Sequence, residues 1–269
     1  MKGETMKQLQ KLSFLAVFAA AGAATSADIV FSDAKWKDAV DGSFSETDRW
    51  DQGRVPSRAE GTVVNGFLFN KAEDYTVGVD KPATLNFLYI GADFGDESAG
   101  KVTLAVTNDH LMSSVPVGWT GYDPASGSEK TMSRRSLELK GPLAEMVVKD
   151  GAVLTVRPEI PDNTWVHSTI GRISDGARLY VTNAALKLDT LHNATYGDAH
   201  LHFDSVGTIG YTSVVEVVDG SVSYNGADDG ASYGNPWKFR ECSRGIFTDT
   251  VLDMGAAWDL SPSSVEQNN

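Results

Sequence analysis

The stretch DGAVLTV, residues 150–156, is the part of the chain that decides the fold. Aspartate and glycine tolerate the backbone of a tight turn, and the β-branched and apolar residues after them are typical of a short strand. The same order recurs as DGARLYV at 175–181 and as DGSVSY at 219–224, and a related Gly-Asp turn precedes AHLHF at 199–203. The pattern predicts an all-β chain whose strands begin directly after turns.

These turns recur at a similar spacing along the chain. Their aspartates stand at positions 150, 175, 198 and 219, which are 25, 23 and 21 residues apart, and the pair Ile-Gly recurs at 90–91, 170–171 and 209–210. Repeats of this length indicate the coils of a parallel β-helix, a β-solenoid in which stacked coils bury a common core. The residues after the turns, Ala152, Ala177 and Ala199, should then lie in adjacent layers.

The alternative architecture is an antiparallel β-sandwich, which also has short strands between turns. A sandwich favours two-residue hairpins, and the Asn-Gly signal for such a hairpin occurs only at residues 65–66 and 225–226. We therefore favour the β-helix.

The composition is that of an acidic globular chain. Its 269 residues include 36 Asp and Glu against 23 Lys and Arg, which gives a net charge of -13 at pH 7. This charge excludes a general nucleic-acid binder, because phosphate neutralisation needs a basic surface. Cys242 is the single cysteine, so it forms no intrachain disulfide, and we expect it to be a small buried residue or an isolated thiol.

The first 27 residues have the order of a secretory signal peptide. Lys7 and Lys11 precede an apolar run at residues 12–24, and small residues follow up to Ala27. The run of about 13 residues is shorter than the roughly 20 that a bilayer span needs. We expect cleavage near Ala27, a secreted or cell-surface location, and no membrane span in the mature chain.

The rest of the sequence divides by its patterns. Residues 28–80, with Trp36 and Trp50, predict an N-terminal cap over the first coil, since an uncapped stack would expose unpaired strand groups. Residues 81–260 predict the β-solenoid, with long loops near 108–135 and 225–248, and residues 261–269 form a tail.

A resemblance supports this organisation. Trp36, the stretch WDQGRVP at residues 50–56, and the repeated Ile-Gly and Asp-Gly-Ala strands resemble the β-helical repeat proteins of bacterial surfaces, including autotransporter passengers. The resemblance implies export, a right-handed parallel β-helix and a role in adhesion or extracellular scaffolding. The sequence departs from that family because it shows no translocator barrel, sorting tail or anchor, so we expect a fragment or a short C-terminal cap.

Histidines offer one candidate metal site. His200 and His202 share a face of the strand AHLHF, and His192 precedes them, while His110 and His167 stand apart in the sequence. Imidazole is a common zinc ligand, but no acidic or cysteine ligand has a matching spacing. We expect a solvated strand face and no metal.

Acidic residues offer two further candidates. The turn from Asp93 to Glu97 could supply oxygen ligands to calcium, but it matches no EF-hand spacing, so we expect a solvated turn. Asp228 and Asp229 are similar to the paired aspartates of polygalacturonase-type hydrolases, whose companion motifs are missing here. We expect this pair to form a polar turn.

These observations define the expected function. The sequence holds no GxSxG, HExxH, Walker or GxGxxG motif, and Trp119, Trp165 and Trp237 either stack on sugar rings or pack loops against the coils. We predict no catalytic residue and no cofactor, and an exported adhesive or scaffolding protein whose partner is an extracellular glycan or a surface protein. The alternative is a carbohydrate-active enzyme or glycan-binding module on the same scaffold.

Overall fold

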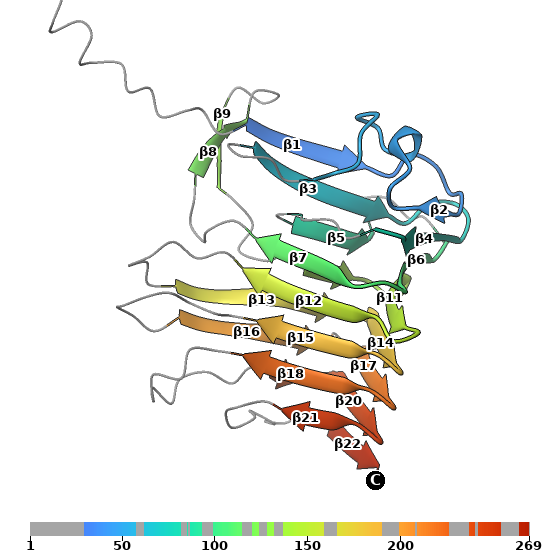
Figure 1. Ribbon diagram of the computed structural model, residues 1–269, viewed down its shortest axis with the longest axis vertical. Helices are drawn as coiled ribbons and strands as arrows, with labels where there is room; N and C mark the ends of the chain where they lie inside the picture. Colours follow the sequence, from blue (N-terminus) through green and yellow to red (C-terminus); the bar gives the residue numbers. More distant parts are fainter. Residues whose placement is uncertain are drawn as a thin grey trace, which may run out of the picture.

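Figure 1 shows a computed structural model of the chain. It describes residues 30–57, 62–81, 85, 87–92, 99–114, 120–123, 128–131, 137–158, 166–189, 199–207, 209–225, 237–239, 242–253 and 264–268. Within these ranges the regular elements are strands, apart from one 3-10 turn, η1 (Thr47–Arg49). The chain is therefore all-β, as the sequence predicts.

The strands form three large sheets, here named A, B and C, and one hairpin. Sheet A contains, in spatial order, β1 (Val30–Lys35), β3 (Thr62–Phe69), β5 (Phe87–Gly91), β10 (Leu137–Lys140), β13 (Val166–Ser174), β16 (Ala199–Val206) and β19 (Trp237–Phe239). Sheet B contains β2 (Gly42–Ser43), β4 (Tyr75–Val79), β6 (Val102–Val106), β11 (Ala144–Lys149), β14 (Arg178–Thr182), β17 (Ser213–Val218), β20 (Ser243–Thr248) and β22 (Ser264–Asn268). Sheet C contains β7 (His110–Ser114), β12 (Val153–Pro158), β15 (Ala185–Asp189), β18 (Ser221–Asn225) and β21 (Val251–Asp253). The hairpin is β8 (Thr120–Asp123) with β9 (Ser128–Thr131).

Neighbouring strands within sheets A, B and C are all parallel. The chain passes through the three sheets in turn, so that β10, β11 and β12 are followed by β13, β14 and β15 one layer further on (Figure 1). Parallel pairing is confirmed, and it excludes the antiparallel sandwich. The arrangement is compatible with a β-helix.

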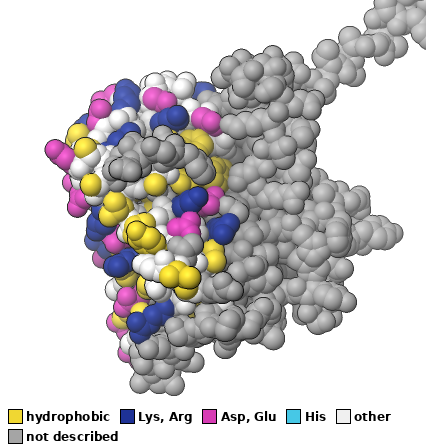
Figure 2. Space-filling view, turned by 180° about the vertical axis from the view of Figure 1, so that it is seen from behind, with side chains coloured by type: hydrophobic (Ala, Val, Ile, Leu, Met, Phe, Trp, Pro, Cys, Tyr) yellow, Lys and Arg dark blue, Asp and Glu magenta, His cyan; other side chains and the backbone are white. Residues whose placement is uncertain are grey.

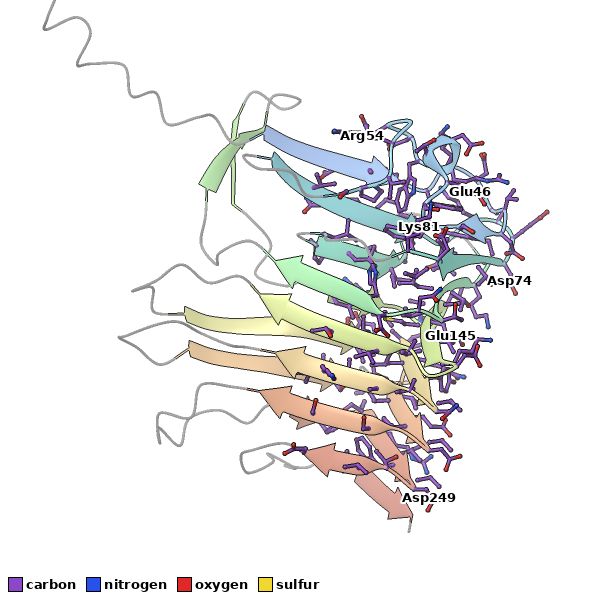
Figure 3. The ribbon with its side chains drawn as sticks, viewed as in Figure 1. Glu46, Arg54, Asp74, Lys81, Glu145 and Asp249 are labelled. Carbon is purple, nitrogen blue, oxygen red and sulfur yellow. The ribbon has the colours of Figure 1, made fainter. Side chains whose placement is uncertain are left out.

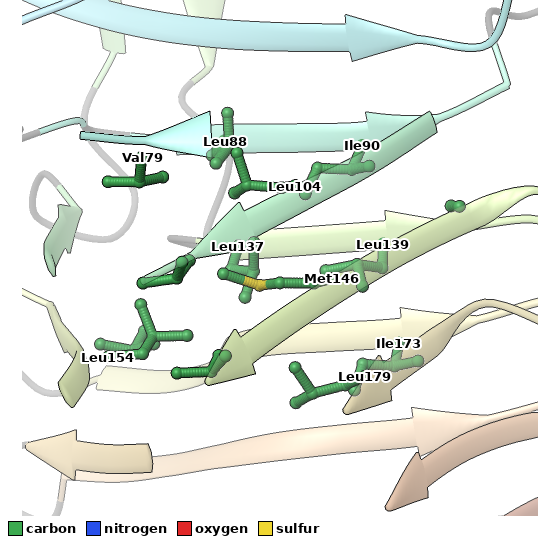
Figure 4. Close-up of a cluster of buried hydrophobic side chains, with 14 of the residues drawn as sticks. Val79, Leu88, Ile90, Leu104, Leu137, Leu139, Met146, Leu154, Ile173 and Leu179 are labelled. Carbon is green, nitrogen blue, oxygen red and sulfur yellow. The ribbon is translucent and has the colours of Figure 1, made fainter. Parts of the chain in front are cut away.

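The core consists of apolar columns that run from layer to layer. In sheet A, Ile90, Leu139 and Ile173 occupy paired positions, and in sheet B so do Met146 and Leu179. All five are fully buried and belong to one cluster (Figure 4). Because side chains alternate along a strand, each layer sends every second residue into this core.

A column of left-handed residues marks the corner between sheets B and C. Asp150, Asn183, Asp219 and Asp249 directly follow β11, β14, β17 and β20, and their φ angles lie between 46° and 62°. They recur after 33, 36 and 30 residues. One passage of the chain through the three sheets therefore takes about 30–36 residues, and the expected repeat of 21–25 residues is wrong.

The error has a local cause. Asp175, with a φ of 56°, belongs to the corner between sheets A and B, and Asp198 lies outside the described residues. Among the described residues, left-handed positions occur both between sheets A and B and between sheets B and C, and aspartate and asparagine both tolerate that conformation. Counting aspartates mixes the two corners and passes over Asn183. For the same reason Ala152 and Ala177 lie at different corners and not in one column.

Three aromatic side chains lie at the N-terminal end of the core. Trp36, Phe44 and Trp50 are each at most 1% exposed, and the Trp50 ring lies edge-on to the other two, with centroids 5.3 and 5.0 Å away. The Trp50 indole N–H donates to the Phe44 carbonyl oxygen at 2.9 Å. Strands β1 to β4, from the region 28–80, already pair within sheets A and B, so stacking begins at Val30.

The connections from sheet C to sheet A are the long ones. Residues 159–165, 190–198 and 226–236, which make such connections, lie outside the described residues. The region 108–135, expected as a loop, contains β7 and the β8–β9 hairpin, and the region 225–248 contains β19 and β20. Among the described residues, no helix has the length and apolar character that a membrane crossing requires.

Candidate binding surface

Four aromatic side chains lie on the outer face of sheet A, separate from the core. The tripeptides Phe67-Leu68-Phe69 in β3 and Phe87-Leu88-Tyr89 in β5 alternate, so the leucines enter the core and the aromatic rings take the opposite side. The register places Phe67 beside Tyr89. We name these four residues, Phe67, Phe69, Phe87 and Tyr89, the aromatic patch.

The rings of the patch contact one another. Phe67 and Phe69 are stacked with centroids 5.4 Å apart, and Tyr89 lies 5.7 Å from Phe69 and 6.4 Å from Phe87. Such aromatic pairs contribute about 0.5–1.5 kcal/mol each beyond their buried area. Phe69, Phe87 and Tyr89 are at most 9% exposed, whereas Phe67 is half-buried. The patch therefore presents mainly Phe67 on a preformed aromatic base.

Polar groups of β1, β3 and β5 lie in or beside the patch. The Lys35 ammonium lies 5.6 Å from the centroid of the Phe69 ring, a cation–π geometry, and the Lys35 side chain is exposed. The Asn65 amide donates to the Asp33 carboxylate at 2.7 Å. The Tyr89 hydroxyl donates to the Ala92 carbonyl oxygen at 2.7 Å. One end of the outer face thus combines an aromatic ring, a cation and a hydrogen-bonded amide.

The same face continues along the stack with charged residues. Paired positions run from Lys35 to Phe67, Tyr89, Glu138 and Arg172 on five successive strands. Adjacent parallel strands lie about 4.8 Å apart, so this row spans roughly 19 Å. The row mixes apolar and ionic side chains, and within it Tyr89 is buried.

The described part of the face in Figure 2 carries no large region of one charge. Figure 2 shows Lys and Arg intermixed with Asp and Glu on the described part of the rear face, with hydrophobic side chains between them. In sheet B, the Lys101 ammonium pairs with the Glu145 carboxylate at 3.2 Å. Glu145 lies on the outward side of sheet B in Figure 3. Because its carboxylate is paired with Lys101, it is less available to a charged ligand.

Most candidates from the sequence lie where no side chain is described. The acidic turn 93–97, the aspartates 228 and 229, the tryptophans 119 and 165, and His192 lie outside the described residues. His200 and His202 are in β16 and Trp237 is in β19, but their side chains are outside the described set.

Cys242 and His110 have surroundings that the sequence did not predict. Cys242 is exposed with a φ of 52°, so the expectation of a buried cysteine is wrong and an isolated thiol remains. His110 is 2% exposed in β7, and burial lowers its pKa to about 4. His110 is therefore a neutral core residue at pH 7.

The aromatic patch was not found from the sequence. Its signal is the repeated tripeptide aromatic-Leu-aromatic at residues 67–69 and 87–89. Read alone, each is a continuous apolar run, which is typical of a strand buried on both faces. Only the pairing of β3 with β5 places the four rings side by side.

Comparison of the chain with protein-family models, with curated proteins and with solved structures finds no match in any of the three. Among the side chains that the structure describes, no group of three or more His, Cys, Asp or Glu residues could hold a metal ion. The aromatic patch and the row from Lys35 to Arg172 are thus the candidate binding surface.

Proposed function

We propose that the chain is a right-handed parallel β-helix with an N-terminal cap, exported to the cell surface or medium, where it serves in adhesion or as a scaffold. The observation that carries the proposal is the passage of the chain through three parallel sheets in turn, over one continuous core. Parallel crossover connections are right-handed in almost all proteins, which supports the handedness. We assign the cap to residues 28–80, in which the buried Trp36 and Trp50 support it.

A stack of this kind supports an adhesive role because it offers flat, rigid faces. Function in a repeat protein commonly resides on an extended face formed by equivalent positions of successive repeats. The outer face of sheet A has such positions in the row from Lys35 to Arg172, with the aromatic patch at one end. We assign the partner, an extracellular glycan or a surface protein, to this face.

Export is proposed from the sequence order of residues 1–27. Mass spectrometry of protein recovered from the culture medium or the cell surface should find a mature N-terminus near Asp28. An uncleaved chain confined to the cytoplasm would contradict it.

The binding proposal is tested with a panel of immobilised glycans and matrix proteins. The purified chain should bind at least one of them, and Phe67→Ala should weaken that binding by roughly tenfold, about 1.4 kcal/mol. Tyr180→Ala is the matched control, because Tyr180 is a half-buried aromatic residue on the outer side of sheet B. Equal losses in both variants, or no binding to any member of the panel, would overturn the assignment.

The enzyme alternative is separated by a second assay on the same preparation. Acidic polysaccharides are incubated with the chain, and new reducing ends and unsaturated products are measured. Turnover that Asp228→Asn or Asp229→Asn abolishes would replace the adhesive function by hydrolysis or elimination. We expect no turnover, since acid–base cleavage needs two carboxylates held across the scissile bond.

A further inference from the structure

The outer side of sheet B presents a regular array of side chains on four successive strands, β11, β14, β17 and β20. On each strand, buried residues alternate with half-buried or exposed ones. The buried positions include the core residues Met146, Leu179 and Val217, so the alternate positions point away from the core. Each strand therefore contributes three outward side chains.

The register sorts these outward side chains into three rows that cross the strands. The central row is, in order along the stack, Val147, Tyr180, Glu216 and Ile246. The rows on either side of it are Glu145, Arg178, Val214 and Arg244, and Lys149, Thr182, Val218 and Thr248. We name these residues the sheet B face.

The central row is complementary to its own reverse. A two-fold axis parallel to the strands, midway between β14 and β17, would set each row of one copy opposite the same row of a second copy in reverse order. Val147 would then face Ile246 of the second copy, and Tyr180 would face its Glu216. The Arg178 guanidinium donates to the Tyr180 hydroxyl at 3.3 Å, so the Glu216 carboxylate would meet a hydroxyl donor and a cation together.

The flanking rows are compatible with the same arrangement. Glu145 would face Arg244 of the second copy, and no charged residue of the sheet B face would lie directly opposite one of like sign. Because the Glu145 carboxylate already pairs with Lys101 at 3.2 Å, the central row is the stronger evidence. A two-fold axis parallel to the stack would instead set Glu216 opposite its own copy, which like-charge repulsion disfavours.

We propose that two copies of the chain associate face to face through sheet B, with their stacks antiparallel. Six strands from β6 to β22, about 4.8 Å apart, and five residues along each strand give a geometric area of roughly 480 Å² per copy. The two copies together cover roughly 950 Å², at the low end of specific interfaces, which is typical of weak and reversible association. Half-buried apolar side chains, among them Val147 and Ile246, contribute to this area.

The overall charge of the chain does not prevent such contact. The net charge of -13 repels copies at long range. At 0.15 M salt, however, exposed charges more than about 8 Å apart are largely screened, whereas opposed groups in contact are not. The proposal does not depend on the adhesive function. Chain diluted well below the dissociation constant is monomeric, so Tyr180→Ala remains a control in the binding panel.

The first test is sedimentation equilibrium of the purified chain over a range of concentrations at 0.15 M salt. A reducing agent is present, because the exposed Cys242 could otherwise join two copies by a disulfide. We expect a reversible monomer–dimer equilibrium. Arg178→Glu should weaken it by roughly tenfold or more, about 1.4 kcal/mol, since the new carboxylate lies near Glu216 of the second copy in both symmetric contacts. Lys187→Glu, an equal change of charge at an exposed position of sheet C, is the matched control and should change the affinity by less than about twofold.

The second test is rescue by charge reversal, which a misfolded variant could not show. Glu216→Arg should also weaken self-association, and an equimolar mixture of Arg178→Glu with Glu216→Arg should form a heterodimer in which each contact joins opposite charges. Circular dichroism confirms that each variant is folded. A natural chain that stays monomeric at every concentration, a dimer that Arg178→Glu leaves unchanged, or a mixture that does not associate would each overturn the proposal. Loss of the dimer in Phe67→Ala but not in Arg178→Glu would also overturn it, because the interface would then lie on sheet A.

Discussion

Acid should weaken the N-terminal part of the stack through one buried imidazole. His110 begins β7, pairs with Leu154 of β12, and its ring centroid lies 6.1 Å from that of Phe44. Burial lowers the pKa of His110 to about 4 from its ordinary value of 6.5. The unfolded chain therefore binds a proton between these pH values and the folded chain does not, so stability is complete above about pH 6.5 and falls as the pH drops to about 4.

The magnitude follows from the two pKa values of His110. The loss in the free energy of unfolding is about 2 kcal/mol at pH 5 and about 3 kcal/mol once the pH is below about 4. A loss of this size is a large fraction of the stability of an ordinary domain, about 5–15 kcal/mol.

The assay is urea unfolding at pH 7 and pH 5 at constant ionic strength, monitored by circular dichroism. Tryptophan fluorescence gives a second signal, because Trp50 packs against Phe44, the ring next to His110. His110→Gln cannot take up the proton, so its unfolding free energy should change by about 2 kcal/mol less between these pH values. If the variant and the natural chain lose the same free energy, the reasoning about His110 is refuted.

Three further predictions concern packing and are measured by chemical unfolding. Leu154→Ala should lower the free energy of unfolding by about 2–5 kcal/mol, because the leucine is fully buried in the core. Leu154→Asp should abolish cooperative unfolding. A loss below about 1 kcal/mol in Leu154→Ala would contradict the core assignment. Gly245→Ala should lower the free energy of unfolding by about 1–3 kcal/mol, because its new Cβ would lie 2.8 Å from a phenylalanine ring. Gly78→Ala, with no atom closer than 3.9 Å, should be nearly neutral. Equal losses in the two variants would contradict this packing argument. Trp50→Phe should lower the free energy of unfolding by about 1–3 kcal/mol, since it leaves the buried Phe44 carbonyl oxygen without this donor. An unchanged midpoint of the unfolding transition would count against the importance of that hydrogen bond.

The strand pattern after turns was predictable because it is local. The turn at Asp150 and the strand Val153–Pro158 lie where the sequence placed them, and Leu154 is buried as alternation requires. Parallel pairing was predictable from the scarcity of hairpin turns. The aromatic residues Trp36 and Trp50 are buried at the N-terminal end of the core, and their role in a cap stays a prediction.

The candidate surfaces could not be predicted in the same way. Phe67 and Tyr89 form a patch only because β3 and β5 pair in one register. Residues two apart on a strand are visible in the sequence as neighbours on a face. Residues one coil apart are not, because the number of residues in a coil varies.

The sequence by itself determined that the chain is all-β, where its strands start, and which side of many strands is apolar, since turn conformations and alternation depend on a few neighbouring residues. Only the tertiary structure decided the coil length and the register. Asp150, Asn183 and Asp219 form one column because successive layers pair through backbone hydrogen bonds, such as that from the Asn183 N–H to the Val218 carbonyl oxygen at 3.0 Å. Every residue type except proline offers the same backbone donor and acceptor, so these bonds do not tell from the sequence which strands pair.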